Sequence, residues 1–169
     1  MIVLAPSSIA ECYSLTARAF ALAERFRSPV LLLTDKELNL TANTVDLKDF
    51  GPPAEPPVRR GAEEGPPYRF TPEGEVPPLA MYGAGWPVRF TGSTHDEKAI
   101  ITKHPATVDK LNRHLAAKIE EHLDELELAG VDLQPGARTL ALSYGVTAGA
   151  MRQAVRRVRA RGGKVSAVT

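Results

Sequence analysis

The sequence predicts an α/β fold made of two incomplete parallel β-α-β units that are joined by a proline-rich connector. Three observations support this prediction: a strand–helix–strand pattern in residues 1–40, a change of composition in residues 41–104, and a second such pattern within residues 105–169. Short, continuous apolar runs are typical of strands that are covered on both faces, as in parallel sheets. A helix between two parallel strands forms a right-handed crossover.

The first unit follows from apolar runs and helix-end signals. Residues 2–5 predict a buried strand, and residues 30–33 predict a second one. Ser8 is expected to cap the helix between them, and Glu11 is expected to bond back to the Ser8 amide in a capping box. Apolar residues at a spacing of three and four give this helix one buried face. Pro29 ends it.

The connector is defined by its prolines. Of the 14 prolines in the chain, ten fall between residues 38 and 87: Pro52, Pro53, Pro56, Pro57, Pro66, Pro67, Pro72, Pro77, Pro78 and Pro87. Proline-rich spacers are extended and semi-rigid, so we expect this segment to lie over another domain or subunit. A proline-rich ligand for an aromatic groove is the alternative. Its expected interface anchors are Tyr68, Phe70, Met81, Tyr82 and Trp86.

The run Thr94, His95, Asp96 and Glu97 carries the densest chemistry in the sequence. A histidine beside two carboxylates could act as a general base. Adjacent residues do not face the same way, which argues against a metal site. A loop rich in serine and threonine before these residues is also typical of a hydrogen-bonded turn. The two interpretations are a structural turn and a position near a cofactor or substrate cleft.

A long helix is predicted from Pro105, which occupies a favoured first-turn position. Its apolar stripe is expected at a spacing of three and four, on Val108, Leu111, Leu115, Ile119, Leu123 and Leu126. Lys118 is placed on the polar side. His114 and His122 are interpreted as surface histidines, because a zinc pair prefers a spacing of four. Residues 131–135 are expected to form a turn.

The second unit has strands over residues 138–143 and 164–168, with a helix over 148–161. The turn before the helix contains Gly145 and Thr147. A plain strand-to-helix turn and an anion site at the helix N-terminus are both possible there, although the sequence lacks a P-loop pattern. Five arginines make the helix basic, which indicates a solvated or subunit-facing surface, or a groove for an anion such as the tail of coenzyme A.

Composition narrows the function classes. The formal net charge is +1, which gives no reason to expect nucleic acid or another polyanion as a partner. No apolar run is long enough to span a membrane, and no secretory signal is visible. We therefore expect a cytoplasmic protein. Cys12, the single cysteine, excludes an internal disulfide and a cysteine-bound metal or cluster. It is interpreted as a buried structural thiol, with a reactive thiol as the alternative.

Three segments resemble the alpha subunit of 2-oxoacid:ferredoxin oxidoreductases, the family of pyruvate and 2-oxoglutarate synthases. Residues 2–38 are similar to the last crossover of its pyrimidine-binding-type, thiamine-type domain. Residues 90–97, FTGSTHDE, are similar to a segment after its linker, and residues 140–154, LALSYGVTAGAMRQA, to the opening of its transketolase C-terminal-like domain. The segments occur in family order. The resemblance implies that the chain is a partial-length piece, with 1–40 ending the first domain and 105–169 starting the second.

The resemblance implies oxidative decarboxylation of a 2-oxoacid to an acyl-coenzyme A, with electrons passed to ferredoxin. The assembled complex would use thiamine diphosphate, Mg²⁺, coenzyme A and iron–sulfur clusters, none of them bound by this chain alone. The beta subunit would be the direct partner and ferredoxin an indirect one. No catalytic residue carries over, because the family's substrate-contacting residues and activating glutamate lie upstream. Thr94, His95, Asp96, Glu97, Gly145 and Thr147 remain candidate cofactor contacts.

On this interpretation the chain supplies scaffold and subunit interface, in a hetero-oligomer or by self-association, and is inactive alone. The alternative is a non-catalytic α/β interaction protein derived from such a subunit. Copurification with a cluster-containing beta chain would favour the enzyme subunit. A stable monomer without thiamine-dependent activity would favour the interaction protein. The 2-oxoacid that is used stays open.

Overall fold

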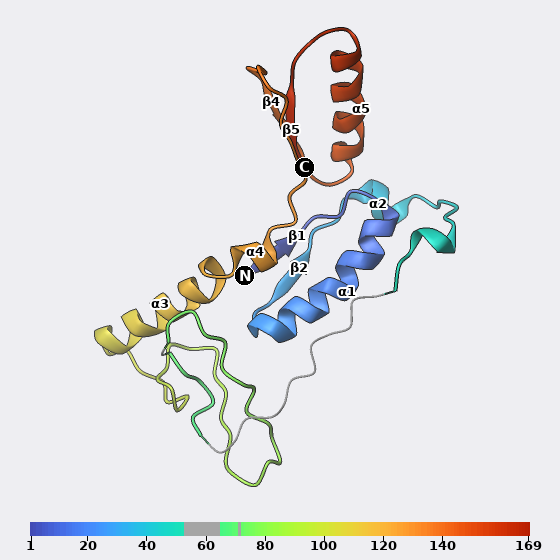
Figure 1. The fold of residues 1–169 in the computed structure, drawn as a ribbon. Helices are drawn as coiled ribbons and strands as arrows, with labels where there is room; N and C mark the ends of the chain where they lie inside the picture. Colours follow the sequence, from blue (N-terminus) through green and yellow to red (C-terminus); the bar gives the residue numbers. More distant parts are fainter. Residues whose placement is uncertain (53–64, 71) are drawn as a thin grey trace. The chain divides into compact units, whose positions relative to one another are not determined.

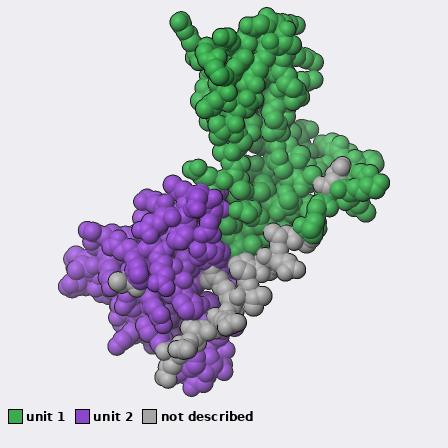
Figure 2. Space-filling model, viewed as in Figure 1, with its two compact units in different colours: residues 1–23, 28–56, 127–169 green, residues 24–27, 57–126 purple. Residues whose placement is uncertain are grey.

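The computed structural model describes residues 1–52, 65–70 and 72–169. The chain forms two compact units (Figure 2): unit 1 contains residues 1–23, 28–56 and 127–169, and unit 2 contains residues 24–27 and 57–126. The predicted α/β fold with parallel strand pairs is confirmed. The three-part division of the chain at residues 40 and 104 stays a prediction.

Unit 1 begins with a strand, a helix and a parallel strand (Figure 1). β1 (Ile2–Leu4) pairs with β2 (Val30–Leu32), so that Ile2 lies opposite Val30, and α1 (Ile9–Phe26) connects them. Ile2 and Leu4 are buried while Val3 between them is exposed, the alternation expected of a strand with one covered face. The helix α2 (Lys36–Leu40) and the 3₁₀ turn η1 (Leu47–Asp49) follow.

The start of α1 differs from the predicted capping box. Ser8 caps the helix as expected, since its hydroxyl accepts a hydrogen bond from the Glu11 amide at 3.2 Å. The Glu11 carboxylate, however, accepts from the amide and the hydroxyl of Ser7, at 2.7 and 2.8 Å. The predicted bond to the Ser8 amide was therefore placed one residue too late. Ser7 offers the carboxylate two donors at once, whereas the Ser8 amide would offer one.

The second part of unit 1 is a three-stranded sheet in the order β3-β5-β4. β4 (Leu140–Leu142) and β5 (Ser166–Val168) are parallel and are connected by α5 (Thr147–Ala160), which lies along them in Figure 1. Val155 of α5 packs with Val165 and Ala167, and Ala141 and Met151 extend this core.

The predicted turn over residues 131–135 was wrong at its start. Val131 and Asp132 form strand β3 (Val131–Asp132), antiparallel to β5. Two residues are too few to show a periodic pattern, and their partners lie more than thirty residues away in the chain. The Arg159 guanidinium holds this edge, because it contacts the Asp132 carboxylate at 2.8 Å and the Val165 carbonyl at 2.7 Å.

Large apolar side chains remain exposed on the strands of unit 1. They include Val3, Leu31, Val131, Leu140 and Leu142, the last with 70% of its surface accessible. Parallel strands are normally covered on both faces. These strands therefore present apolar surface that the described residues of the chain do not cover.

Unit 2 combines a long helix with the chain before it. α3 (Pro105–Glu120) is followed by the separate short helix α4 (Leu123–Leu126), so the predicted single helix ends earlier than expected. Phe70, Ala80, Ala99 and Leu111 are buried in this unit. Of the expected interface anchors, Phe70 is a core residue with 2% exposure, whereas Met81 and Tyr82 are exposed. The proline-rich segment thus contributes to a core within its own chain.

The predicted inner face of α3 is confirmed at Leu111, which is buried, and was wrong at three other positions. Leu115 is 46% exposed, while His114 and Lys118, which had been placed on the surface, are 5% and 6% exposed. The buried stripe therefore contains Leu111, His114 and Lys118, a spacing of three and four that is shifted around the helix. The Phe70 ring lies 5.5 Å from the His114 ring, and both histidine and lysine can bury the apolar part of their side chains.

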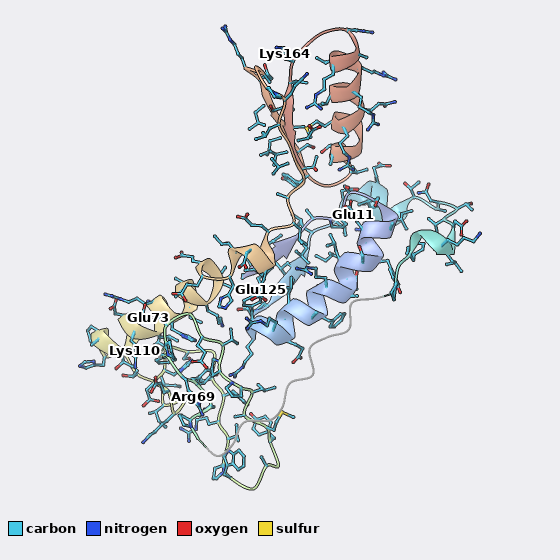
Figure 3. All side chains as sticks on the ribbon, viewed as in Figure 1. Glu11, Arg69, Glu73, Lys110, Glu125 and Lys164 are labelled. Atoms are coloured by element: carbon cyan, nitrogen blue, oxygen red, sulfur yellow. The ribbon has the colours of Figure 1, made fainter. Side chains whose placement is uncertain are left out.

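His122 was also predicted as a surface histidine, and it is partly buried. Its ring meets Phe26 edge-on at a centroid distance of 5.5 Å. The last turn of α1, which carries Phe26, belongs to unit 2 with the region around α4. Arg25 donates there to the Glu125 carboxylate at 3.0 and 3.2 Å. Glu125 is labelled in Figure 3.

Candidate functional site

The segment around His95 is a tight turn with a buried ring. His95 forms an isolated antiparallel bridge with Ile101, and its Nδ1 lies 2.8 Å from the Asp96 carbonyl. The imidazole stacks on Tyr68 at a centroid distance of 4.0 Å, and Phe70 is 5.9 Å away. Although its neighbours in sequence are polar, the His95 ring therefore lies against the rings of Tyr68 and Phe70.

The polar neighbours of His95 bind the turn itself. Asp96 accepts from the amides of Lys98 and Ile100, both at 2.9 Å. Glu97 accepts from the Phe70 amide at 2.9 Å and from Lys110 Nζ at 3.3 Å. Their oxygens therefore have structural partners, as the turn interpretation expects. Their roles as cofactor contacts stay predictions.

Thr94 belongs to the same turn, because its hydroxyl donates to the Thr102 carbonyl at 2.8 Å. Thr94 and His95 also line a cavity of about 250 Å³ in unit 2, which Asp96 and Glu97 do not line. The cavity is bounded by the turn, by the loop before it, by α3 and by Arg27 at the end of α1. Of the four candidate residues, Thr94 and His95 line the cavity, whereas Asp96 and Glu97 hold the turn through hydrogen bonds.

Arg27, His114 and Lys118 are titratable residues of this cavity that were not among the predicted site residues. Burial lowers the pKa of His114, and the nearby Lys118 charge lowers it further, against a hydrogen bond with the Glu73 backbone that raises it. His114 also stacks near Phe70 at 5.5 Å. No local sequence signal identifies these residues, because Arg27 lies far from the others in the chain and His114 and Lys118 lie off the apolar stripe of α3.

Arg27 reaches this unit because the chain turns sharply after α1. Its φ of 46° is uncommon for a residue other than glycine. Its guanidinium lies 5.9 Å from the Tyr68 ring centroid and 6.0 Å from that of Phe90. It donates to the Pro67 carbonyl at 3.3 Å. Burial lowers the pKa of Arg27, and the group stays charged near neutral pH.

The second candidate site, around Gly145 and Thr147, lies in unit 1. Gly145 has a φ of 64°, and the Val146 amide after it donates to the Asp35 carboxylate at 3.0 Å. The Thr147 hydroxyl donates to the Tyr144 carbonyl at 2.8 Å. An anion at this helix start would be repelled by the Asp35 carboxylate, which already accepts the hydrogen bond of the Val146 amide. The observed contacts are those of a strand-to-helix turn.

Asp35 accepts hydrogen bonds from two separate segments, and the sequence analysis did not identify it as a site residue. Hydrogen bonds from the backbone of Leu38, first, and then of Val146 and Glu37 lower its pKa. Asp35 caps α2 through the Leu38 amide at 3.0 Å. The ionised Asp35 carboxylate therefore links the segment after β2 to the start of α5 through hydrogen bonds.

The contacts of Cys12 and of the α5 arginines bear on whether the thiol is structural or reactive and whether the arginines face solvent, a subunit or an anion. Cys12 is half-buried rather than buried. Burial, first, and the charges of Asp35 and Glu11 raise the pKa of its thiol, which favours the structural interpretation over the reactive one. Arg159 binds Asp132, and Arg152 donates to the Ser7 hydroxyl at 3.2 Å. Arg156, Arg157 and Arg161 are exposed.

In residues 1–52, 65–70 and 72–169, no group of three or more His, Cys, Asp or Glu side chains could hold a metal ion. A magnesium diphosphate needs oxygen ligands for its metal, and the helix start at Val146 already faces a carboxylate. These residues alone do not fit a thiamine diphosphate site. Within the same ranges, none of the helices combines the length and apolar character needed to cross a membrane.

The fold and the sequence together define a class of protein. The family model described as pyruvate flavodoxin/ferredoxin oxidoreductase, thiamine diphosphate-binding, matches residues 1–113. Since this is more than half of the chain, the protein belongs to that family. The resemblance expected from residues 2–38 and 90–97 is thereby confirmed.

Individual relatives agree with this assignment. The chain is 32% identical over 169 residues to a 2-oxoglutarate synthase subunit KorA of Methanocaldococcus jannaschii, with 96% of this chain and 43% of the relative covered. It is 34% identical over 172 residues to the KorA subunit of Methanothermobacter marburgensis, with 96% of this chain and 44% of the relative covered. The chain thus spans less than half the length of these relatives, as expected for a partial-length piece.

A solved structure shares the fold over nearly the whole chain. It is the 2-oxoglutarate:ferredoxin oxidoreductase from Magnetococcus marinus with 2-oxoglutarate, coenzyme A and succinyl-CoA bound. The TM-score is 0.78 at 26% sequence identity, and the match covers 99% of this chain and 30% of that one.

Proposed function

We propose that this chain forms part of the alpha subunit of a 2-oxoacid:ferredoxin oxidoreductase that acts on 2-oxoglutarate. The reaction is oxidative decarboxylation to succinyl-coenzyme A, with two electrons passed to ferredoxin. The observation that carries the proposal is the similarity, over 96% of the chain, to 2-oxoglutarate synthase subunits. A solved 2-oxoglutarate:ferredoxin oxidoreductase with the same fold supports the choice of substrate.

The cofactors of the proposed complex are thiamine diphosphate, Mg²⁺, coenzyme A and iron–sulfur clusters. A single cysteine cannot supply a cluster ligand set. We therefore assign the clusters to the beta subunit of the same complex, which is the proposed direct partner, with ferredoxin receiving electrons from it. Thiamine diphosphate would be held with residues from outside this chain.

The proposed role of this chain is structural: it supplies scaffold and interface. The exposed leucines and valines on β1 to β4 support this role, because apolar surface of this kind is typical of sites that a partner covers. The buried core around Val155 and the buried core around Phe70 provide separate rigid supports for such surfaces.

The test is coexpression of the 169-residue chain with the beta subunit from the same genome and with an alpha-subunit segment that supplies the missing part. We expect copurification and 2-oxoglutarate-dependent reduction of a viologen dye in the presence of coenzyme A and thiamine diphosphate. Pyruvate in place of 2-oxoglutarate is the control for substrate. A chain that never copurifies with these subunits would instead support the non-catalytic interaction protein.

A further inference from the structure

The His95 ring is a buried imidazole with one hydrogen bond. His95 is 6% exposed, and its Nδ1 atom lies 2.8 Å from the Asp96 carbonyl oxygen. A carbonyl oxygen can only accept, so Nδ1 carries the proton of this bond. In a neutral imidazole the other nitrogen, Nε2, is then a hydrogen-bond acceptor. The contact with Asp96 therefore fixes the tautomer and leaves one acceptor on the ring.

This acceptor, Nε2 of His95, has no hydrogen-bond partner among the described residues. It is also not closed off from solvent, in contrast to the fully buried Nδ1 atom of His114. His95 lines the cavity of unit 2, together with Gly92, Ser93 and Asn112, which are exposed. A molecule can therefore enter this cavity from solvent and meet a ring nitrogen that is able to accept a hydrogen bond.

We propose that the cavity of unit 2 binds a phenol, the hydroxyl of which donates a hydrogen bond to Nε2 of His95. The phenol is either a free aromatic molecule or the tyrosine side chain of a partner chain. Its ring lies among the aromatic walls of the cavity, where Tyr68 is 4.0 Å and Phe70 is 5.9 Å from the His95 ring. Contacts between aromatic rings add to the free energy of burial.

The size of the cavity and its fixed walls agree with a ligand of this kind. A volume of about 250 Å³ is sufficient for one substituted benzene, since an apolar cavity of about 150 Å³ already holds benzene. The Tyr68 ring is held in place, because its hydroxyl donates to the Thr91 carbonyl at 3.2 Å and accepts from the Thr91 amide at 3.3 Å. The wall is thus formed before the ligand arrives.

The polar groups of the cavity disfavour charged ligands. An ionised carboxylate has no proton to donate to Nε2 of His95. An ammonium ion could donate, but the Arg27 guanidinium, which also lines the cavity, would repel it. Arg27 already donates to the Pro67 and Pro78 carbonyls, at 3.3 and 3.5 Å. A neutral donor on an aromatic ring is therefore the chemistry that these walls accept best.

The proposal does not depend on the 2-oxoacid oxidoreductase activity, and its test uses binding alone. The full 169-residue chain is titrated with p-cresol, and separately with toluene and with p-methylanisole, which share the ring but cannot donate a hydrogen bond. The nitrogen signals of the imidazoles are followed by NMR, and those of His95 are identified by their loss in His95→Phe. We expect a saturable shift of His95 Nε2 with p-cresol, at a Kd of about 1 mM.

The comparison of ligands isolates the hydrogen bond in the unaltered protein. Toluene and p-methylanisole should bind about fivefold more weakly than p-cresol, the factor expected for one neutral hydrogen bond. In His95→Phe, which keeps a ring beside Tyr68 but removes Nε2, the three ligands should bind equally. His122→Phe is the matched control, because the His122 ring packs against Phe26 and does not line the cavity. It should keep the preference for p-cresol.

A capped tyrosine, N-acetyltyrosine methylamide, distinguishes the two sources of the phenol. If it binds more tightly than p-cresol, the occupant is a tyrosine of a partner chain; if it binds more weakly, the occupant is a free phenol. Equal binding of p-cresol, toluene and p-methylanisole to the wild type would overturn the proposal, whether or not the variants fold. A preference for p-cresol that persists in His95→Phe would also overturn it.

Discussion

Phe70→Ala should destabilise unit 2 strongly. Phe70 is 2% exposed, its ring lies 5.5 Å from His114 and 5.9 Å from His95, and the Lys110 ammonium lies 5.9 Å from it. An aromatic side chain buries roughly 150–250 Å² of surface. At about 25 cal/mol per Å², this burial contributes about 4–6 kcal/mol to the free energy of unfolding. Measured truncations of buried phenylalanine cost about 3–5 kcal/mol, a large share of the ~5–15 kcal/mol that stabilises a domain.

The measurement is native-state hydrogen exchange of the α3 amides, which reports the opening of unit 2 separately from unit 1. We expect protection in α3 to fall by about two to three orders of magnitude in Phe70→Ala, since 1.4 kcal/mol is tenfold. Tyr82→Ala is the matched control: this ring also contacts an aromatic, Phe90, but it is 72% exposed, so the loss should stay below about 1 kcal/mol. Equal losses of protection in the two variants would refute a core built on Phe70.

The remaining predictions concern the helix face, acid stability and assembly. Leu111→Asp should lower the free energy of unfolding by several kcal/mol, about the penalty for an unpaired buried charge. Leu115→Asp should lower it by about 1 kcal/mol or less. Equal rates of hydrogen exchange of the α3 amides in the two variants would show that the buried face is misassigned. The folded-state pKa of Asp35 is lowered, so its stabilising effect is present above about pH 3.9 and lost as pH falls through the folded pKa. Urea midpoints should therefore drop more between pH 5 and pH 2 in the wild type than in Asp35→Asn, and parallel curves would contradict this. The isolated chain should self-associate at micromolar concentration in sedimentation and should show no 2-oxoglutarate-dependent dye reduction; a well-protected monomer, or turnover, would contradict the proposed scaffold role.

Much of unit 1 could be predicted from the sequence, because its signals are local. Apolar runs, Pro29 and the serines before α1 are sufficient to place β1, α1 and β2 within one or two residues. The second crossover was predicted in the same way, with α5 one residue from its expected bounds at each end. β3 was missed, because a two-residue strand exists only through its pairing with β5.

The cavity of unit 2 could be predicted only in part. Thr94 and His95 stand out in the sequence, since polar residues gather there. Arg27 lies 68 residues before His95, and only the left-handed turn after α1 brings it to the same cavity. Lys118 was assigned to the polar side of the helix because it lies off the predicted apolar stripe.

What the sequence determined by itself is the family, the α/β class and the positions of β1, α1, β2, β4, α5 and β5 to within about two residues, because these depend on residue types within one or two turns of chain. What only the tertiary structure decided is the side of α3 that is buried. A leucine stripe predicts an inner face when the partner is unknown. Here the partner includes the Phe70 ring, which lies 5.5 Å from the His114 ring, so His114 and Lys118 are buried and Leu115 is left exposed.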